Sequence, residues 1–258
     1  MSFCDRAMNK TKIAIFDIDG TIFRKNLHFE LINELVWMRA FPVRVREALT
    51  TTYTNWLEHQ GTYEEYRRAL VELYAEHIKG CSTEMVKRAS TAVISFHQRR
   101  TYIFAEALIN RLREQSYYIL AISGSPQEIV EEYNHAYLKF DQVFGSVYEV
   151  DATGRYTGEA SFEPSKDKSL VARQVITEQH LGFKDSLAMG DTESDAKILE
   201  IVETPIAFNP NQNLKAIADA NAWRVIVEKK DMIYDMSLTT EKQTGSPEAI
   251  LDALHLHS

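Results

Sequence analysis

The chain has 258 residues, 45% of them hydrophobic and 26% charged, which is enough apolar material for one sizeable core with room for an inserted unit. Its formal net charge of −8 disfavours binding to nucleic acid or to an anionic membrane. Two cysteines, Cys4 and Cys81, are too few for a disulfide framework or a zinc site, and no long apolar segment is present, so we expect a cytoplasmic protein that does not span a membrane.

Five apolar runs of strand length recur along the chain, and helical patterns follow them. The runs lie at 12–16, 117–123, 186–190, 204–208 and 223–228. Their hydrophobicity is continuous rather than alternating, which is typical of strands that are covered on both faces in a parallel sheet. The pattern therefore predicts an α/β fold.

About ninety residues separate the first two runs and contain no convincing strand, although a single crossover helix needs far fewer. This predicts a helical cap domain at 26–100, inserted into a core domain that consists of 1–25 and 101–258. Aromatic side chains at helical spacing usually pack inward, so we expect most of those in the cap to form its core. They are Trp37, Phe41, Tyr53, Trp56, Tyr63, Tyr66 and Tyr74.

Two further elements follow later in the chain. Residues 143–161 alternate between apolar and polar around the turn at 151–154, which contains a glycine, and predict a β-hairpin at the edge of the sheet. Near the end, Ser246 and Pro247 predict the N-cap and first turn of a short peripheral helix.

The first candidate motif, FDIDGT, places Asp17 and Asp19 directly after the first run. Ligands of open parallel sheets bind beyond the carboxyl ends of the strands, and two carboxylates this close need a cation or a shared proton. A solvated turn is the alternative, because Asp-Gly pairs favour turns. A calcium loop is excluded, since Ile22 stands where that loop needs glycine and His28 where it needs glutamate.

The second motif, SGSPQE, follows the second run. We expect the strand to end at Ser123 and Gly124 to permit a tight bend. Ser125 and Glu128 then predict a capping box, with Pro126 in the first helical turn. The start of such a helix would bind an anion beside the Ser123 hydroxyl, although a well-capped helix without a ligand has the same sequence.

The third motif is a pair of lysines, Lys166 and Lys168, before an amphipathic helical pattern. Lysines near a helix start oppose the helix dipole, which indicates that one of them serves another purpose. A surface lysine is the alternative interpretation.

The fourth motif, GDTESD, places Asp191, Glu193 and Asp195 after the third run. Three acids at the end of a strand indicate a hard-cation site such as magnesium, whereas a helix N-terminus enriched in acids is the alternative. A calcium loop again fails, because Ala196 replaces its glycine and Val202 its glutamate.

The order of these four motifs, strand-DxDGT, strand-S-G, lysine, strand-GDxxxD, resembles the haloacid dehalogenase superfamily, specifically its phosphoserine phosphatase-like subfamily IB. The resemblance covers the chain from about residue 12 to 228, including the helical cap and the hairpin. It implies a Rossmann-like, doubly wound parallel core. It also implies a magnesium-dependent phosphatase that hydrolyses a small phosphomonoester.

The resemblance also implies roles for individual residues. Asp17 would attack phosphorus to form a phosphoaspartate, and Asp19 would act as general acid and base. Magnesium would be held by Asp17, by the main-chain carbonyl of Asp19 and by Asp191, with Asp195 in the second shell. Lys168 would neutralise charge during catalysis.

The phosphoryl group would be bound by the Ser123 hydroxyl, the main-chain N–H of Gly124 and Lys168. Lys168 matches the family lysine better than Lys166, because its distance to GDTESD agrees and it opens the amphipathic helix.

The substrate is less defined by these motifs. Phosphoserine phosphatases use a Glu after the first motif and an Arg in the cap, but Asn26 stands near the Glu position, with Glu30 one turn later, and Arg67 and Arg68 do not align cleanly. An aromatic wall in the cap would accept a choline-like head group by cation–π contact.

Two other functions remain open at this point: a phosphomutase on the same scaffold, and a noncatalytic phosphate-binding or regulatory protein. A receiver domain is disfavoured because receivers are shorter and lack both the insert and an acid at Asp19. We expect a small phosphorylated metabolite as the partner, and a monomer or homodimer.

Overall fold

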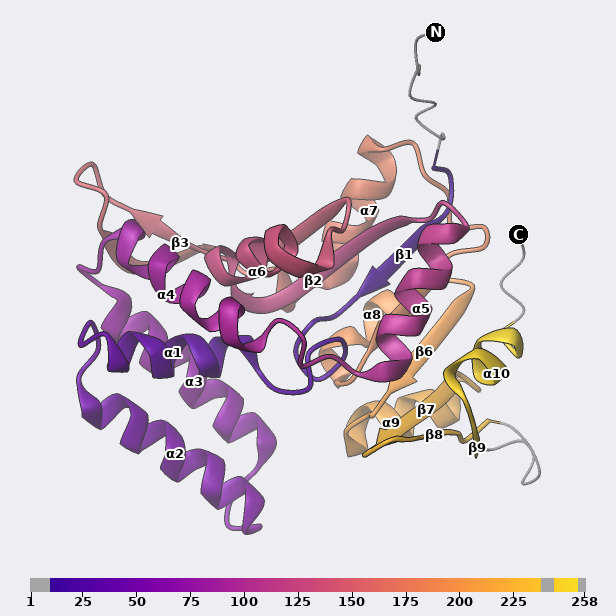
Figure 1. Cartoon of the computed structure of the whole chain (residues 1–258), viewed down its shortest axis with the longest axis horizontal. Helices are drawn as coiled ribbons and strands as arrows, with labels where there is room; N and C mark the ends of the chain where they lie inside the picture. Colours follow the sequence, from indigo (N-terminus) through magenta and orange to yellow (C-terminus); the bar gives the residue numbers. More distant parts are fainter. Residues whose placement is uncertain (1–9, 238–243, 255–258) are drawn as a thin grey trace, which may run out of the picture.

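The computed structural model describes residues 10–237 and 244–254, and nine strands in this part form one sheet with helices on both faces (Figure 1). The strand order is β4-β3-β2-β1-β5-β6-β7-β8-β9. The strands are β1 (Ile13–Phe16), β2 (Tyr118–Pro126), β3 (Gln142–Val150), β4 (Tyr156–Phe162), β5 (Leu187–Gly190), β6 (Thr204–Phe208), β7 (Arg224–Lys229), β8 (Met232–Asp235) and β9 (Thr244–Gly245).

The predicted α/β fold is confirmed. All five apolar runs are strands, namely β1, β2, β5, β6 and β7, and each pairs in parallel with its neighbour among them. In β1, Ile13 and Ile15 face one apolar cluster while Ala14 and Phe16 face the other, so both faces are buried. This explains why the run shows no alternation.

The helices fall into three groups. Between β1 and β2 the chain forms α1 (Leu27–Trp37), α2 (Val43–Leu57), α3 (Tyr63–Ile78) and α4 (Thr83–His97). One face of the sheet packs against α5 (Ile103–Glu114), α6 (Gln127–Tyr133) and α10 (Pro247–Asp252). The other face packs against α7 (Lys168–Glu178), α8 (Ala196–Leu199) and α9 (Gln212–Ala220).

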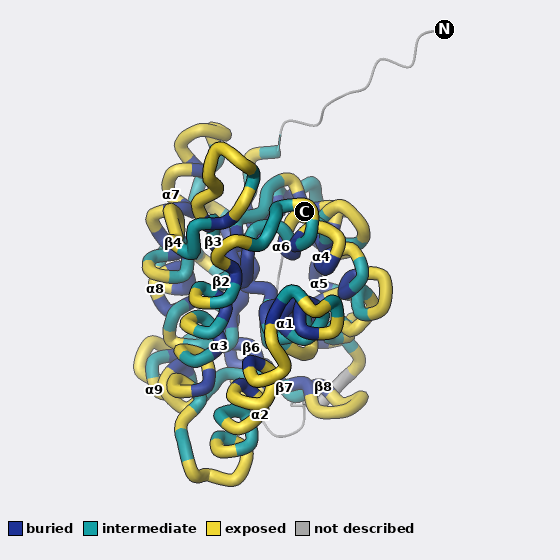
Figure 2. The backbone as a smooth tube through the Cα atoms, turned by 90° about the vertical axis from the view of Figure 1, so that its left-hand side faces the viewer, coloured by how far each residue is buried: buried dark blue, intermediate teal, exposed yellow. Residues whose placement is uncertain are grey.

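The segment α1–α4 lies to one side of the sheet (Figure 1), and its helix α2 is largely exposed (Figure 2). No strand interrupts it, as the sequence predicted. Its division from the rest of the chain into a cap domain at 26–100 stays a prediction.

The predicted hairpin at 143–161 is confirmed as β3 and β4, which pair in antiparallel. The first half of β3 also pairs in parallel with β2, so the hairpin is a continuation of the sheet. Its turn lies against the α3–α4 loop: the Gly80 N–H donates to Tyr156 O at 2.8 Å and the Tyr156 N–H to Cys81 O at 3.0 Å. The hairpin therefore ties the helical segment to the sheet edge.

The predicted C-terminal helix is α10: Pro247 is its first residue, and the Ser246 Oγ accepts from the Ala249 N–H at 3.3 Å. Cys4 and residues 238–243 and 255–258 of the predicted closing segment lie outside the described residues. Within the described ranges, no helix combines the length and apolarity needed to cross a bilayer.

Candidate active site

The FDIDGT motif forms a tight turn at the carboxyl end of β1, which lies between β2 and β5 in the sheet. The Asp17 N–H donates to Met189 O at 3.0 Å, so the turn begins beside the end of β5. Gly20 has φ +83°, and a Cβ there would lie 2.1 Å from Asp191 Oδ2. Glycine is required at this position because the first and fourth motifs touch there.

Lys168 links two of the predicted aspartates. Its Nζ lies 2.5 Å from Asp17 Oδ1 and 2.6 Å from Asp195 Oδ1, and all three side chains are buried. Burial lowers the pKa of Lys168, but the charges of Asp17 and Asp195 outweigh this effect, so its pKa lies above the usual value. Lys168 is therefore a fixed cation in the interior.

The neighbouring Lys166 differs in its exposure and in its partner. It ends a short 3₁₀ turn, Pro164–Lys166, its side chain is 75% exposed and it pairs with Glu163. Lys168 is the first residue of α7, where Asp167 caps the helix by accepting from the Ser169 N–H at 3.1 Å. The geometry agrees with the choice of Lys168.

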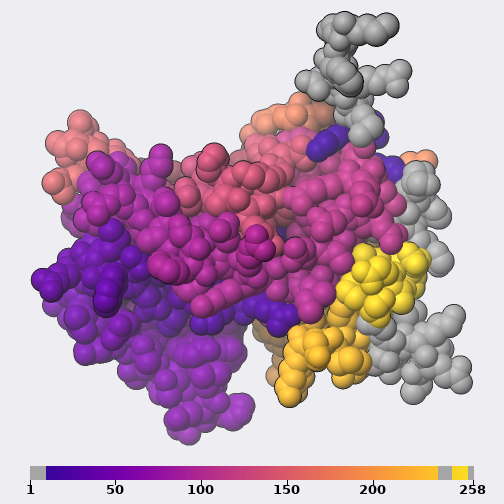
Figure 3. All heavy atoms as spheres, viewed as in Figure 1, coloured from indigo at the N-terminus to yellow at the C-terminus, as the bar shows by residue number. Residues whose placement is uncertain are grey.

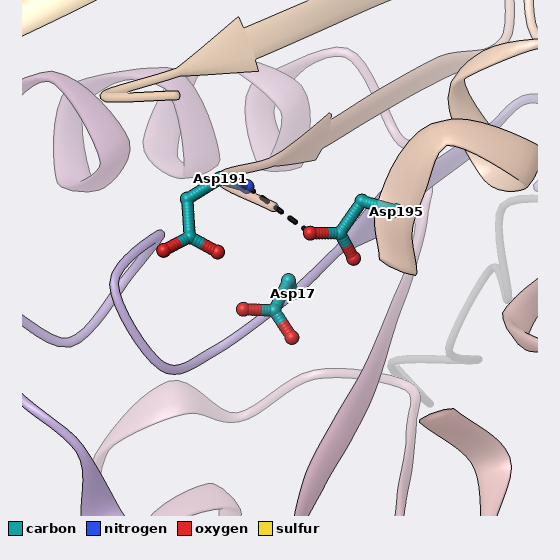
Figure 4. A group of neighbouring side chains, drawn as sticks. All are labelled: Asp17, Asp191 and Asp195. Carbon is teal, nitrogen blue, oxygen red and sulfur yellow. Dashed lines mark hydrogen bonds between the residues drawn. The ribbon is translucent and has the colours of Figure 1, made fainter. Parts of the chain in front are cut away.

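The GDTESD motif brings its two aspartates beside Asp17 (Figure 4). One carboxylate oxygen from each of Asp17, Asp191 and Asp195 lies within 4.8 Å of the others. Asp195 Oδ2 accepts from the main-chain N–H groups of Asp191 and Thr192 at 3.1 Å each, and its Oδ1 meets Lys168. Both oxygens of Asp195 are thus engaged, one with the main chain of the loop and the other with Lys168.

Asp17 and Asp191 are the carboxylates with oxygens left for a ligand. Burial raises the pKa of Asp17 to about 7, against the opposing effect of Lys168. Loss of hydration also raises the pKa of Asp191 well above its usual value, and the Asp17 charge adds to this. The single ammonium group of Lys168 does not balance the charges of the three carboxylates, so the site is suited to a further cation.

Asp19 is held by three donors. The Ser123 hydroxyl donates to its Oδ2 at 2.9 Å and the Ser125 hydroxyl at 2.7 Å, while the Leu27 N–H donates to its Oδ1 at 2.5 Å. Burial nevertheless raises the pKa of Asp19 above its usual value. A fixed carboxyl group with a raised pKa has the properties of a general acid.

The predicted capping box at the second motif is wrong. β2 continues through Pro126, which is the N-cap of α6 and makes no side-chain capping bond. Ser125 donates to Asp19 instead, because a carboxylate is a strong acceptor, and Glu128 accepts from the Tyr156 hydroxyl at 2.5 Å. The anion site expected at the start of α6 stays a prediction.

Ser125 was expected to cap a helix, but it is a site residue that donates to Asp19. The signal was available, because residues i and i+2 of a strand point to the same face. A strand that runs through SGSP would have placed Ser123 and Ser125 together beside the first motif. Gly124, between them, lines the cavity next to Asp17.

A cavity of about 360 Å³ opens over these residues. Asp17, Asp19 and Lys168 line one side of it. The opposite side is formed by α1 and α3 and carries polar and charged side chains, namely Asn26, His28, Glu64, Arg67 and Arg68. Of the residues considered for substrate selection in the sequence, Asn26, Arg67 and Arg68 thus line this cavity, whereas Glu30 does not and pairs with Lys25.

The aromatic residues of the helical segment differ in how far they are buried. Phe41, Tyr66 and Tyr74 are buried, as expected. Tyr53, Trp56 and Tyr63 are only partly buried and line a second cavity. For Trp37, the expectation of a core position is wrong: it is the last residue of α1 and is 79% exposed.

The sequence matches a known protein family. The family model of haloacid dehalogenase-like hydrolases matches residues 14–200. The chain belongs to this family. The match spans all four motifs, from the turn after β1 to the loop after β5.

Two relatives carry phosphatase names. The chain is 22% identical over 212 residues to a phosphoserine phosphatase of Archaeoglobus fulgidus, covering 81% of this chain but 56% of that protein, so it spans about half of that relative. It is 21% identical over 230 residues to a histidinol-phosphatase of Neisseria meningitidis serogroup C, covering 83% of this chain and 97% of that protein. These relatives support a phosphoric monoester hydrolase.

Among solved structures, a phosphoserine phosphatase with an analogue of its phospho-aspartyl intermediate superposes with a TM-score of 0.59 and 23% identity. The superposition covers 86% of this chain and 95% of the other. It shows the same fold, a Rossmann-like haloacid dehalogenase fold.

Proposed function

We propose that the protein is a magnesium-dependent phosphatase that hydrolyses a small phosphomonoester through a phosphoaspartate on Asp17. The observation that carries the proposal is the cluster of the buried Asp17, Lys168 and Asp195 and the partly buried Asp191, beside the hydrogen-bonded Asp19. Family membership and the phosphatase names of two relatives support the same chemistry.

The donor set fits magnesium. This ion takes oxygen ligands and keeps several waters, and Asp17 and Asp191 offer carboxylate oxygens close together. In the proposal, Asp17, Asp191 and the main-chain carbonyl of Asp19 hold the ion, while Asp195 orients the Asp191 main chain and Lys168 through its hydrogen bonds to both. Bound magnesium would supply positive charge that reduces the repulsion between the attacking carboxylate and the phosphoryl group.

The remaining steps belong to the side chains. An Asp17 oxygen forms a bond to phosphorus as the ester P–O bond breaks, and Asp19 gives its proton to the leaving alcohol. Asp19 then takes a proton from the water that cleaves the phosphoaspartate. Lys168 neutralises charge on Asp17 and on the phosphoryl oxygens throughout.

Ser123 and the main-chain N–H of Gly124 are proposed to hold a phosphoryl oxygen. In the structure the Ser123 hydroxyl donates to Asp19, so in this role it turns toward the phosphoryl group. Residues 26–100 are proposed to act as a cap that excludes water during attack and admits it afterwards.

Phosphate release from a panel of small phosphomonoesters, with and without magnesium, tests the proposal. We expect Asp17→Asn to abolish turnover, because the nucleophile is lost, and Asp19→Asn to reduce it roughly 10²- to 10⁴-fold, because only proton transfer is lost. Asp219→Asn is a matched control, since Asp219 is an exposed partner of Lys215 on α9.

Equal residual activity in the Asp17 and Asp19 variants would contradict the assigned roles. Turnover only with a bisphosphorylated activator would indicate a phosphomutase. No magnesium-dependent release from any ester would favour a noncatalytic phosphate-binding or regulatory protein.

A further inference from the structure

A second, larger cavity adjoins the active-site cavity. Its volume is about 560 Å³, and the two cavities share the lining residues Asp19, Asn26, Tyr63, Asp191 and Thr192. Figure 3 shows the surface hollowed between the purple helices and the orange and gold C-terminal part. A substrate whose phosphoryl group lies at Asp17 therefore has a second space open to its alcohol part.

The helical side of this second cavity is an aromatic wall, which we define as Phe29, Tyr53, Trp56, Tyr63 and Tyr66. The rings contact one another: the Trp56 ring lies 5.2 Å from that of Tyr63, and it stacks on Tyr66 at 6.0 Å with an interplanar angle of 11°. Tyr53 meets Tyr66 at 5.3 Å.

Four members of the aromatic wall are only partly buried, whereas Tyr66 behind them is 4% exposed. These four rings pack against the core on one part of their surface and leave another part open to the cavity. Large apolar faces left open within a recessed cavity are typical of ligand-binding sites.

Tyr63 connects the aromatic wall to the reacting groups. It lines both cavities, and its hydroxyl lies within electrostatic reach of Asp191, Asp19 and Asp17, whose charges add to burial in raising its pKa. Because Tyr63 lines both cavities, a substrate that extends from one cavity into the other passes beside its ring.

The arrangement favours a planar ring over a quaternary ammonium group. A cage for such a cation needs rings spaced around it, but the rings here pack against one another and offer a single side.

From these observations, and resting on the proposed phosphatase function, we infer that the substrate is a phosphomonoester of an alcohol bearing an uncharged aromatic ring. The ring lies against the aromatic wall while the phosphoryl group lies at Asp17. This replaces the choline-like head group considered from the sequence.

Three esters of similar size test the inference: 2-phenylethyl phosphate, 3,3-dimethylbutyl phosphate and choline phosphate. We expect kcat/KM for the phenylethyl ester to exceed that of each of the other two by roughly three- to tenfold, the range expected for ring–ring contact beyond simple burial. Equal values for the three, or a preference for choline phosphate, would overturn the inference.

Variants locate the effect. Trp56→Ala should lower the ratio of kcat/KM for phenylethyl phosphate to that for ethyl phosphate roughly three- to tenfold, and Trp56→Phe should restore most of it. Trp37→Ala is the matched control, since Trp37 is an exposed tryptophan that lines neither cavity. An unchanged ratio in Trp56→Ala would contradict the inference.

Binding separates this inference from the proposed chemistry. In the Asp17→Asn variant with magnesium, calorimetry should show tighter binding of phenylethyl phosphate than of ethyl phosphate, and adding Trp56→Ala should reduce that difference. If no ester is hydrolysed by the natural protein but this binding difference is found, the proposed function fails and the ring site stands. If esters are hydrolysed without any such difference, the ring site fails and the function stands.

Discussion

The stability of the protein should depend on pH through His28, which lies on α1 facing the active-site cavity. Its side chain is 2% exposed, and its ring meets that of Tyr74 edge to face at 4.6 Å. Its Nε2 atom has no hydrogen-bond partner among the described residues. Burial therefore lowers the pKa of His28 to about 3, because the charged imidazolium loses its hydration.

The sign of the effect follows from the two pKa values. In the unfolded chain His28 has a pKa near 6.5, so as the pH falls the unfolded state binds the proton first. The contribution is present above pH 6.5 and is lost progressively as the pH falls toward 3. Since one pH unit is worth about 1.4 kcal/mol, moving from pH 7 to pH 5 should cost about 2 kcal/mol through His28 alone.

Urea unfolding at pH 7, 6 and 5 checks this magnitude, with His28→Phe as the variant that keeps a ring but cannot titrate. The natural protein should lose about 2 kcal/mol more than His28→Phe over this range, since the other titrating groups are common to both. His135→Phe, which removes an exposed histidine, is the control and should follow the natural protein. Parallel pH dependence in the natural protein and His28→Phe would refute the reasoning.

Two further substitutions test the buried ion pair of Lys168 and the close packing at Gly190. Lys168→Met leaves Asp17 and Asp195 without their buried cation, so urea unfolding should show that the free energy of unfolding falls by about 3–5 kcal/mol. The control Lys166→Met should change it by no more than about 0.5 kcal/mol. Equal effects of the two substitutions would contradict the buried ion pair. Gly190→Ala puts a Cβ 2.4 Å from the Cβ of Asp195, so it should destabilise the protein by about 1–3 kcal/mol in the same assay, and an unchanged midpoint would show that the loop yields freely.

The parallel strands could be predicted from sequence because both of their faces are buried. The antiparallel strand β8, at the edge of the sheet away from the predicted hairpin, could not be predicted in the same way. β8 reads MIYD, in which Ile233 and Asp235 are buried while Met232 is exposed. Asp235 is buried because Arg224 on the neighbouring β7 pairs with it at 2.6 Å, and such a partner is invisible to a local hydrophobic pattern.

For the candidate site, the sequence indicated which residues lie close together but not all of their contacts. The order of the motifs and the family resemblance brought Asp17, Lys168 and Asp195 together, and the structure places them in contact. The local rule for a capping box failed at Ser125, because the competing acceptor, Asp19, is more than a hundred residues away in sequence. A rule based on neighbouring residues cannot predict a hydrogen-bond acceptor that follows a different strand.

The attachment of the helical segment α1–α4 also depends on distant contacts, and it bears on how substrate enters. At the base of the segment, the Arg24 N–H donates to Arg100 O at 2.8 Å and the Tyr102 N–H to Ile22 O at 3.0 Å. At its far end the α3–α4 loop is bonded to the hairpin, which continues from β3 in the sheet. Because the segment is held at both ends, the proposed cap can open widely only if these backbone hydrogen bonds break or the hairpin moves with it. This favours two connected cavities that are already formed before the substrate binds, which is the condition under which an open aromatic wall selects by shape.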